Sequence, residues 1–292
     1  MLPQQEAVRI PDAEIEWDQV ISGSKPTFSI NFAEIWRYRD LLVLFVRRDV
    51  VTVYKQTVLG PAWFFVQPVL TSLIFAFVFG NLAGISTGGV PQLLFYLCGI
   101  TIWNFFSDTL NSTSRTFTDN AGIFGKVYFP RMILPLSKAI SGFFKFLIQF
   151  AFFLVVWAYY VFVEKSVSPN SWMLIAPFLV VLMALIGLAL GIIITSMTTK
   201  YRDLVFLVGF GVQLLMYASP VIYPVASLPE KYQSLMWFNP LTSIFETFKY
   251  AFLGNGILSI QGLVYSTVCG IVLFVCGIFV FNKVEHTFVD TV

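Results

Sequence analysis

The sequence has little charge. Only 12% of its 292 residues are Asp, Glu, Lys or Arg, against roughly 25% in soluble globular chains, and 57% are hydrophobic. A water-soluble fold of this length cannot bury so much apolar surface, which excludes a pair of soluble domains and predicts an integral membrane protein. The net charge of +2 distinguishes nothing until each charge is assigned to one side of the membrane.

Metal-binding and redox residues are also scarce. The one histidine, His286, lies in the C-terminal tail, so a histidine-rich metal site is excluded. Cys98, Cys269 and Cys276 lie in apolar segments without a Cys-x-x-Cys pair, so we expect them to be small buried packing residues. The first 30 residues are polar and lack the apolar core of a signal peptide, which predicts a cytoplasmic N-terminus.

Apolar runs long enough to cross a membrane account for nearly half of the chain. A spanning helix needs about 20 apolar residues, and no Asp, Glu, Lys or Arg occurs between Lys55 and Asp108. The sequence therefore predicts an all-α integral membrane protein with six transmembrane helices. Their approximate ranges are 62–80, 92–112, 136–163, 172–196, 204–223 and 260–282.

The basic residues orient these six segments. If the N-terminus lies inside, the external loops contain only Lys165, Lys231 and Lys249. Cytoplasmic flanks of membrane proteins carry the excess of Lys and Arg, so both termini are expected in the cytoplasm. The cytoplasmic flanks then hold Arg37, Arg39, Arg47, Arg48, Lys55, Arg115, Lys126, Arg131, Lys138, Lys200, Arg202 and Lys283.

The residues before the first span predict an amphipathic helix in the cytoplasmic membrane interface. Asn31 and Glu34 have the spacing of a helix-capping pair. We expect Leu59-Gly60-Pro61 to form the elbow where the chain turns into the membrane, because Gly permits the bend and Pro suits a first helical turn. Charged and apolar residues separate on the helix, with Arg37, Asp40, Arg47, Arg48 and Lys55 opposite Ile35, Leu42, Val46, Val50 and Val53.

The segment between the fifth and sixth spans predicts short re-entrant helices. Residues 219–258 contain four prolines, which is too irregular for a lipid-exposed span, yet they are too apolar for a free loop. Short helices shielded by the bundle would keep their backbone polar groups bonded at the outer leaflet. The chain thus divides into a cytoplasmic N-terminal segment (1–30), an interface helix (31–58) and a six-helix membrane domain (59–292).

Six segments, in order along the chain, carry a family resemblance. They are YKQTVLGPAWFFVQP, NAGIFGKVYFPRMILPLS, TTKYRDLVF, ASPVIYP, NPLTSIFETFKYAFLGNG and KVEHTFVD. From about Ile35 to Val292, the chain resembles the membrane subunits of ABC-2 type exporters, specifically the polysaccharide and polyol-phosphate export permeases, which serve O-antigen and teichoic acid.

The resemblance implies the partners. Such permeases form homodimers, pair with two copies of a separate ATPase, and move a polyprenyl-pyrophosphate-linked polysaccharide out across the bacterial cytoplasmic membrane. ATP and Mg²⁺ would then bind the ATPase, with no cofactor in this chain and no nucleic acid as partner. The sequence agrees, because it lacks the phosphate-binding loop Gly-x-x-x-x-Gly-Lys-Ser/Thr: Gly125-Lys126 is followed by Val127 and has Asn120 where the first Gly is needed.

Two cytoplasmic segments are candidates for contact with the ATPase. The resemblance implies a coupling helix at about Thr118–Lys126, where Asn120, Ala121, Phe124 and Lys126 match the motif; an ordinary interfacial loop anchored by aromatics is the alternative. The resemblance adds a second contact between spans four and five, although Asp203 there could simply cap the fifth span. That second group consists of Tyr201, Arg202 and Asp203.

Basic residues near the membrane suggest where the substrate enters and passes. Arg47, Arg48 and Lys55 would collect the substrate pyrophosphate, or pin anionic phospholipids. Lys145 continues a polar stripe with Ser137, Ser141 and Gln149, so it either faces a wet interior or snorkels to the interface. An acidic or neutral residue is commoner there in the family, so the resemblance assigns Lys145 no role. The candidate translocation path comprises Trp63, Phe64, Tyr96, Trp103, Lys145, Gln213 and Tyr217.

Two other functions remain open. One is an ABC-2 exporter of a drug or a small lipid. The other is a membrane-embedded transferase acting on lipid-linked sugars, which needs a clustered acid and base. Asp108 and Glu246 are the carboxylates deep in apolar stretches, and the predicted topology puts them on opposite sides. The pair Gly187 and Gly191 has the spacing of a helix-packing motif.

Overall fold

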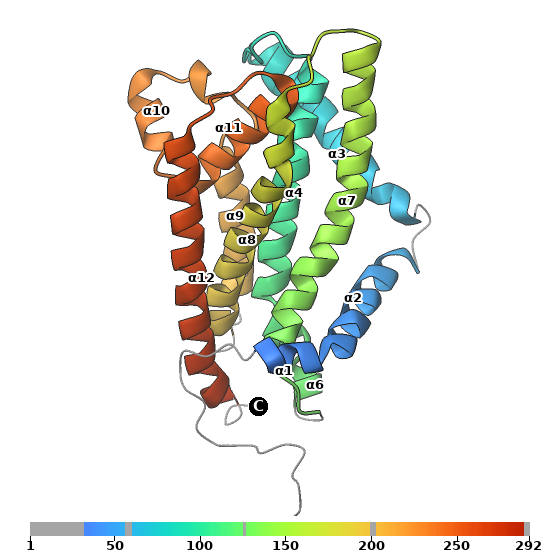
Figure 1. Ribbon diagram of the computed structural model, residues 1–292, viewed down its shortest axis with the longest axis vertical. Coiled ribbons are helices and arrows are strands. Elements are labelled where there is room, and N and C mark those ends of the chain that lie inside the picture. Colours follow the sequence, from blue (N-terminus) through green and yellow to red (C-terminus); the bar gives the residue numbers. More distant parts are fainter. Residues whose placement is uncertain (1–31, 56–59, 125–126, 199–202, 289–292) are drawn as a thin grey trace, which may run out of the picture.

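The computed structural model describes residues 32–55, 60–124, 127–198 and 203–288. Within these ranges the regular structure is all helical, which confirms the predicted all-α membrane protein. The long helices run side by side (Figure 1). At one end, called the inner end after the predicted topology, lie α1 (Phe32–Arg37), α2 (Arg39–Tyr54) and α6 (Ala121–Phe124); at the outer end lie α10 (Glu230–Met236) and α11 (Pro240–Leu253).

Five helices of the described residues are long and apolar enough to cross a membrane. Each corresponds to a predicted span, with ends that differ by a few residues. They are α3 (Trp63–Phe75) with its π-helical continuation (Ala76–Leu82), α4 (Gln92–Ser114), α7 (Ile133–Phe162), α8 (Ala176–Thr198) with the 3₁₀ turn before it (Ser171–Ile175), and α12 (Ile260–Phe288).

The sixth predicted span is shorter than expected. Helix α9 (Leu204–Tyr217) has 14 residues, ~21 Å at 1.5 Å per residue, which falls short of the ~30 Å hydrocarbon core. The count of six spans is therefore not confirmed. The helix was expected to reach Tyr223, but Pro220 lacks an N–H and restricts the residue before it. The Asn239 amide donates to the Ala218 carbonyl at 3.1 Å and so satisfies the backbone where the helix ends.

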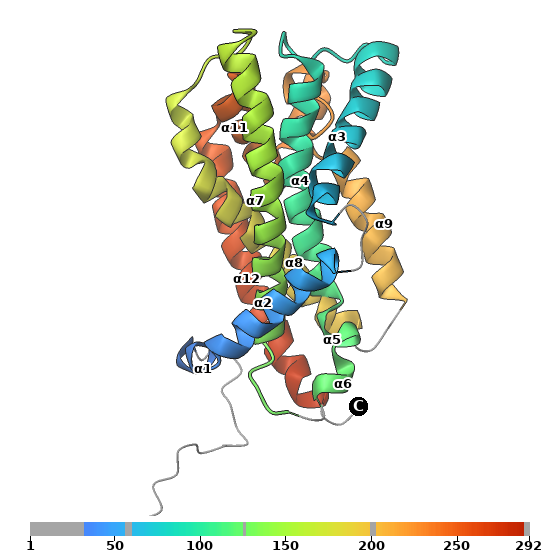
Figure 2. The same cartoon turned by 90° about the vertical axis from the view of Figure 1, so that its right-hand side faces the viewer.

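Helix α4 lies at the centre of the bundle. Most of its apolar length is buried, and it packs against α7 and α8 (Figure 2). The glycine pair of α8 allows this close approach, since a Cβ on Gly191 would lie 2.5 Å from the Thr113 Cβ and one on Gly187 would lie 3.3 Å from the Phe106 carbonyl oxygen. The predicted helix-packing role of the two glycines is confirmed, and α12 packs on α8 in turn.

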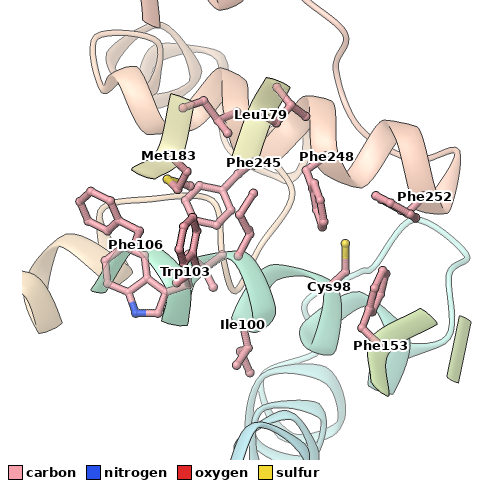
Figure 3. Packing of buried hydrophobic residues seen from close by; sticks show 14 of the residues in the cluster. Cys98, Ile100, Trp103, Phe106, Phe153, Leu179, Met183, Phe245, Phe248 and Phe252 are labelled. Atoms are coloured by element: carbon pink, nitrogen blue, oxygen red, sulfur yellow. The ribbon is translucent and has the colours of Figure 1, made fainter. Parts of the chain in front are cut away.

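An aromatic core joins α4, α7, α8 and α11 (Figure 3). The Trp103 ring on α4 lies 6.3 Å from Phe245 on α11, and Phe153 on α7 lies 5.4 Å from Phe252. Each buried aromatic ring removes roughly 150–250 Å² from solvent and favours such offset or edge contacts. This burial anchors α11 among the spans although α11 itself is not one of them.

The outer segment 219–258 is irregular, as predicted, and consists of a 3₁₀ turn (Val225–Ser227), α10 and α11. A buried ion pair on α11 connects its parts. One Glu246 oxygen accepts the Val225 N–H at 3.3 Å and the other accepts the Ile257 N–H at 3.1 Å. The Lys249 ammonium, 3.9 Å from Glu246, donates to the Pro220 carbonyl. These bonds satisfy backbone groups that no helix would satisfy in this segment.

The predicted interface helix packs on protein as well as facing outward. It divides at Tyr38, whose φ of −95° and ψ of 21° interrupt the helix between α1 and α2. Phe45 is buried with its ring 5.8 Å from Phe129, just before α7, whereas Val43 and Leu44 remain exposed. Helix α2 therefore has an apolar side that faces the protein and a second apolar surface that is exposed. The sequence pattern did not distinguish the two.

The predicted elbow between the interface helix and the first span is present at Gly60. Its φ of +52° is a left-handed conformation that glycine adopts without a side-chain clash. A 3₁₀ turn (Gly60–Ala62) follows and leads directly into α3. Asn31, the proposed helix cap, and residues 56–59 lie outside the described residues.

Candidate functional site

A polar cavity of about 530 Å³ lies toward the inner end, between α2, α4, α5 (Thr116–Asp119) and α7. Three cations and three carboxylates line it, so its charges balance. The lining residues are Arg48, Asp49, Thr52, Asp108, Ser112, Asp119, Asn120, Lys138, Ser141, Gly142 and Lys145.

One half of the cavity is a network of paired charges. Asp49 accepts from Arg48 at 2.9 Å on the same helix and lies 2.8 Å from the Lys138 ammonium on α7. Arg48 also donates to the Asn120 side-chain oxygen at 3.3 Å, and its guanidinium lies 4.9 Å from the centroid of the Phe45 ring. Hydrogen bonds to charged groups, as between Arg48 and Asp49, are among the stronger ones in proteins. The Asp49–Lys138 ion pair connects the interface helix to α7, and the Arg48–Asn120 hydrogen bond connects it to the segment between α5 and α6.

The other half of the cavity carries charges without direct partners. Among the residues that the structure describes, the charged groups of Asp108, Asp119 and Lys145 form no direct hydrogen bond or ion pair, although Lys145 lies near enough to Asp108 for the two charges to attract each other. Hydroxyls beside them are already occupied, since Ser112 donates to the Asp108 backbone carbonyl and Ser141 to a carbonyl of its own helix. The arrangement can therefore offer a ligand one ammonium donor and two carboxylate acceptors.

The predicted coupling segment is two short helices, α5 and α6, rather than one. They meet at Asn120, which is buried and donates to the Thr116 carbonyl at 2.8 Å. Phe117 is buried too, with its ring stacked 5.3 Å from Phe281 of α12 and its N–H donating to the Thr195 hydroxyl of α8. The segment is thereby fixed to α8 and α12, and through Asn120 to Arg48 of α2, whereas its contact with an ATPase stays a prediction.

Several of the predicted coupling residues cannot be placed. Ala121 is half-buried at the start of α6. Lys126, Tyr201 and Arg202 lie outside the described residues, as does the side chain of Phe124. Asp203 is exposed just before α9, where its side chain forms no capping hydrogen bond.

The three predicted entrance residues are not brought together. Arg48 lines the cavity, but Arg47 and Lys55 are exposed and do not line it. Arg48 is also bound to protein groups already, through Asp49 and Asn120. The structure therefore separates one residue of this group from the other two.

The predicted path residues divide into three groups. Tyr96 and Trp103 are buried inside this chain's own core, on α4. Trp63, Gln213 and Tyr217 are exposed, and Phe64 is half-buried. Lys145 alone lines the polar cavity. A shared path along these residues stays a prediction.

Sequence reasoning overlooked four charged residues of the cavity. Lys138 served only to orient the spans, Asp108 only to test a transferase, Asp49 had no assigned role, and Asp119 lay within the predicted coupling helix without being singled out. A signal existed for Lys138, because it lies seven residues, close to two helical turns, before Lys145 on α7. Contact between Asp49 and Lys138 has no such signal, since it depends on how α2 packs.

The described residues contain no metal-binding cluster, and the two carboxylates considered for a transferase lie far apart. No group of three His, Cys, Asp or Glu residues among them could hold a metal ion. Both Glu246 oxygens accept backbone N–H groups at the outer end, whereas Asp108 lines the cavity near the inner end. Asp108 and Glu246 therefore do not share an acid–base site of the kind that a transferase would need.

Comparison with known proteins identifies relatives along most of the chain. The O-antigen export system permease protein RfbA of Klebsiella pneumoniae is 27% identical over 252 residues, which cover 86% of this chain and 94% of that protein. Its namesake from Myxococcus xanthus is 24% identical, over 89% of this chain and 98% of that protein. The capsule polysaccharide export inner-membrane protein CtrC of Neisseria meningitidis is 22% identical, over 79% and 86%.

The family follows from a match at the level of the whole domain. The ABC-2 type transporter model matches residues 40–253, from the interface helix to the end of α11. That range covers well over half of the chain and contains the cavity. The chain belongs to the ABC-2 type transporter family, as its six resembling segments indicated.

Proposed function

We propose that this chain is the permease subunit of an ABC exporter that moves a lipid-linked polysaccharide, such as O-antigen, across the bacterial cytoplasmic membrane. The observation that carries the proposal is the similarity to O-antigen export permeases over nearly their whole length. The apolar helices suit a chain that lies in the membrane, and the distribution of Lys and Arg over the six predicted spans supports both termini in the cytoplasm.

The energy for export comes from a separate subunit. The chain has no phosphate-binding loop, so two copies of a partner ATPase would bind ATP and Mg²⁺, and this chain would bind no cofactor. A homodimer of the permease would then pair with them. The α5–α6 segment is the proposed docking element, because its inner-end position and its contacts with α2, α8 and α12 let movement there reach the spans.

Two other functions fit less well. A small-lipid or drug exporter shares the family, but the similar proteins described above are named for polysaccharide export. A transferase requires a reactive acid and base close together, and Asp108 and Glu246 lie toward opposite ends with both Glu246 oxygens already bonded.

Reconstitution tests the proposal. The tagged chain, purified from its native membranes, is expected to bring an ATPase with it, and the pair is reconstituted in liposomes. We expect ATP hydrolysis only from the pair, with stimulation by a polyprenyl-pyrophosphate-linked polysaccharide and not by amphipathic drugs. Hydrolysis by the isolated chain, or stimulation by drugs alone, would contradict it. An ATPase-site mutant of the partner is the control for contaminating activity.

A further inference from the structure

The cavity holds charged groups at a depth where membrane proteins rarely keep them unpaired. Asp108 lies six residues before the inner end of α4, ~9 Å at helical rise, and Lys145 lies 12 residues into α7, ~18 Å. Both helices are spans, and ionisable side chains within spans face a cavity or a partner group. The cavity that they share therefore explains why these charged side chains are tolerated within the spans.

The pattern of pairing shows which part of the cavity is available. Arg48 and Lys138 already share Asp49, which balances one of those two charges. Among the described lining residues, Lys145 is the cation without a direct ion pair, and Asp108 and Asp119 are the carboxylates without one; Lys145 and Asp108 attract each other only at longer range. A ligand that completes this site must present anionic oxygens to Lys145 and hydrogen-bond donors to the carboxylates.

We propose that the cavity binds a lipid phosphate whose adjoining group donates hydrogen bonds. The phosphate lies against Lys145, with Lys138 and Arg48 nearby, and the adjoining donors bond to Asp108 and Asp119. The volume of about 530 Å³ lies within the range of ligand pockets. A simple anion fits less well, because the carboxylates would repel it.

Two lipids share this chemistry. An ethanolamine phospholipid carries an ammonium next to its phosphate, and a polyprenyl-pyrophosphate-linked sugar carries hydroxyls next to its own. Either lipid reaches a cavity on the cytoplasmic side from the inner leaflet. Only binding of the lipid-linked sugar rests on the proposed function. A phospholipid could bind in the cavity whatever the chain transports.

Binding to the purified chain tests the site without an ATPase. The probes are short-chain phosphatidylethanolamine, phosphatidylcholine (whose choline donates no hydrogen bond), and a polyprenyl-pyrophosphate-linked N-acetylglucosamine. We expect Lys145→Met to weaken binding of the first and third by about tenfold or more, the loss of one charge-assisted bond. Lys231→Met, on the exposed surface of α10, is the matched control and leaves binding unchanged.

Asp108→Asn tests the hydrogen-bond donors of the ligand separately from its phosphate. It should weaken the binding of phosphatidylethanolamine and of the lipid-linked sugar and leave the weaker binding of phosphatidylcholine unchanged. Lys145→Arg, which keeps the positive charge, should retain binding. Preference of the wild-type chain for phosphatidylethanolamine or for the lipid-linked sugar identifies the source. Equal affinity of wild type and Lys145→Met for every probe overturns the site, as does an equal effect of Asp108→Asn on phosphatidylcholine.

Folding and the proposed function are tested apart from the site. Thermal unfolding of each variant shows whether it is folded, and a variant that unfolds early is replaced by Lys145→Gln or Asp108→Ser. Lipid binding by the chain together with failure of polysaccharide-stimulated ATP hydrolysis would count against the proposed export and leave the site standing. The reverse result would count against the site alone.

Discussion

Asp49→Asn removes the carboxylate that holds α2 to α7 and changes little else. Asp49 lies 2.9 Å from Arg48 and 2.8 Å from Lys138, and its side chain is 15% exposed. Asparagine keeps the shape but loses the charge, so both cations lose their counter-ion. Breaking a fully buried ion pair lowers the free energy of unfolding by roughly 3–5 kcal/mol, and breaking a surface pair lowers it by about 0–1 kcal/mol. For this partly exposed pair we expect a loss of about 2 kcal/mol.

The loss should appear in two measurements. In a chain of this size, 2 kcal/mol lowers the thermal unfolding midpoint by about 5 °C. Because Arg48 also bonds to Asn120, releasing Arg48 loosens the proposed docking element from α2. We therefore expect the reconstituted exporter to hydrolyse ATP with less stimulation by the lipid-linked polysaccharide.

Asp40→Asn is the matched control on the same helix. Asp40 is 93% exposed and lies 3.9 Å from Arg39, a geometry that contributes little. Its unfolding midpoint and its stimulation should match those of the wild type. If Asp49→Asn behaves like Asp40→Asn in both measurements, the network does not hold α2, and the reasoning about coupling through Arg48 is refuted.

Two further predictions concern packing and the outer segment. Gly191→Ala puts a methyl group against Thr113 and the α4 backbone, which should cost about 1–3 kcal/mol in thermal unfolding, whereas Gly211→Ala, with no atom within 4 Å, should be neutral or slightly stabilising. Glu246→Gln removes the buried counter-ion of Lys249 and places an amide NH₂ against one backbone N–H, so we expect the free energy of unfolding to fall by roughly 3 kcal/mol. Glu230→Gln on exposed α10 is the control and should leave the unfolding midpoint unchanged. Equal midpoints of the two variants would show that the ion pair does not stabilise the fold.

The parts of the fold set by local pattern were predictable. The length of the apolar runs predicted α4 and α12, because a span must match the thickness of the membrane. It overestimated the length of α9, which ends at Tyr217, shortly before Pro220. Gly60 marked the elbow, since glycine adopts its positive φ without a side-chain clash. The spacing of Gly187 and Gly191 marked a helix contact but not its partner, α4.

The parts set by tertiary packing were not predictable. The sequence placed Tyr96 in the candidate translocation path, whereas the packing of α4 buries it in the core of this chain. Lys138 meets Asp49 because α2 folds back onto α7, a contact between distant segments with no periodic signature. The cavity arises from that fold-back, so its ligand chemistry could be read from no single segment.

Arg48 connects the two functions that were predicted for separate places. It was expected to bind the substrate phosphate, and the structure shows it bonded to Asp49 and Asn120 through Nε and Nη2. A guanidinium has five N–H donors in a rigid fork, so donors on Nη1 remain for a phosphate in the cavity. A phosphate that bonds there competes with Asn120 for the orientation of the same side chain. Occupancy of the cavity would thus change the α5–α6 segment by one hydrogen bond, which is a direct route from ligand to docking element.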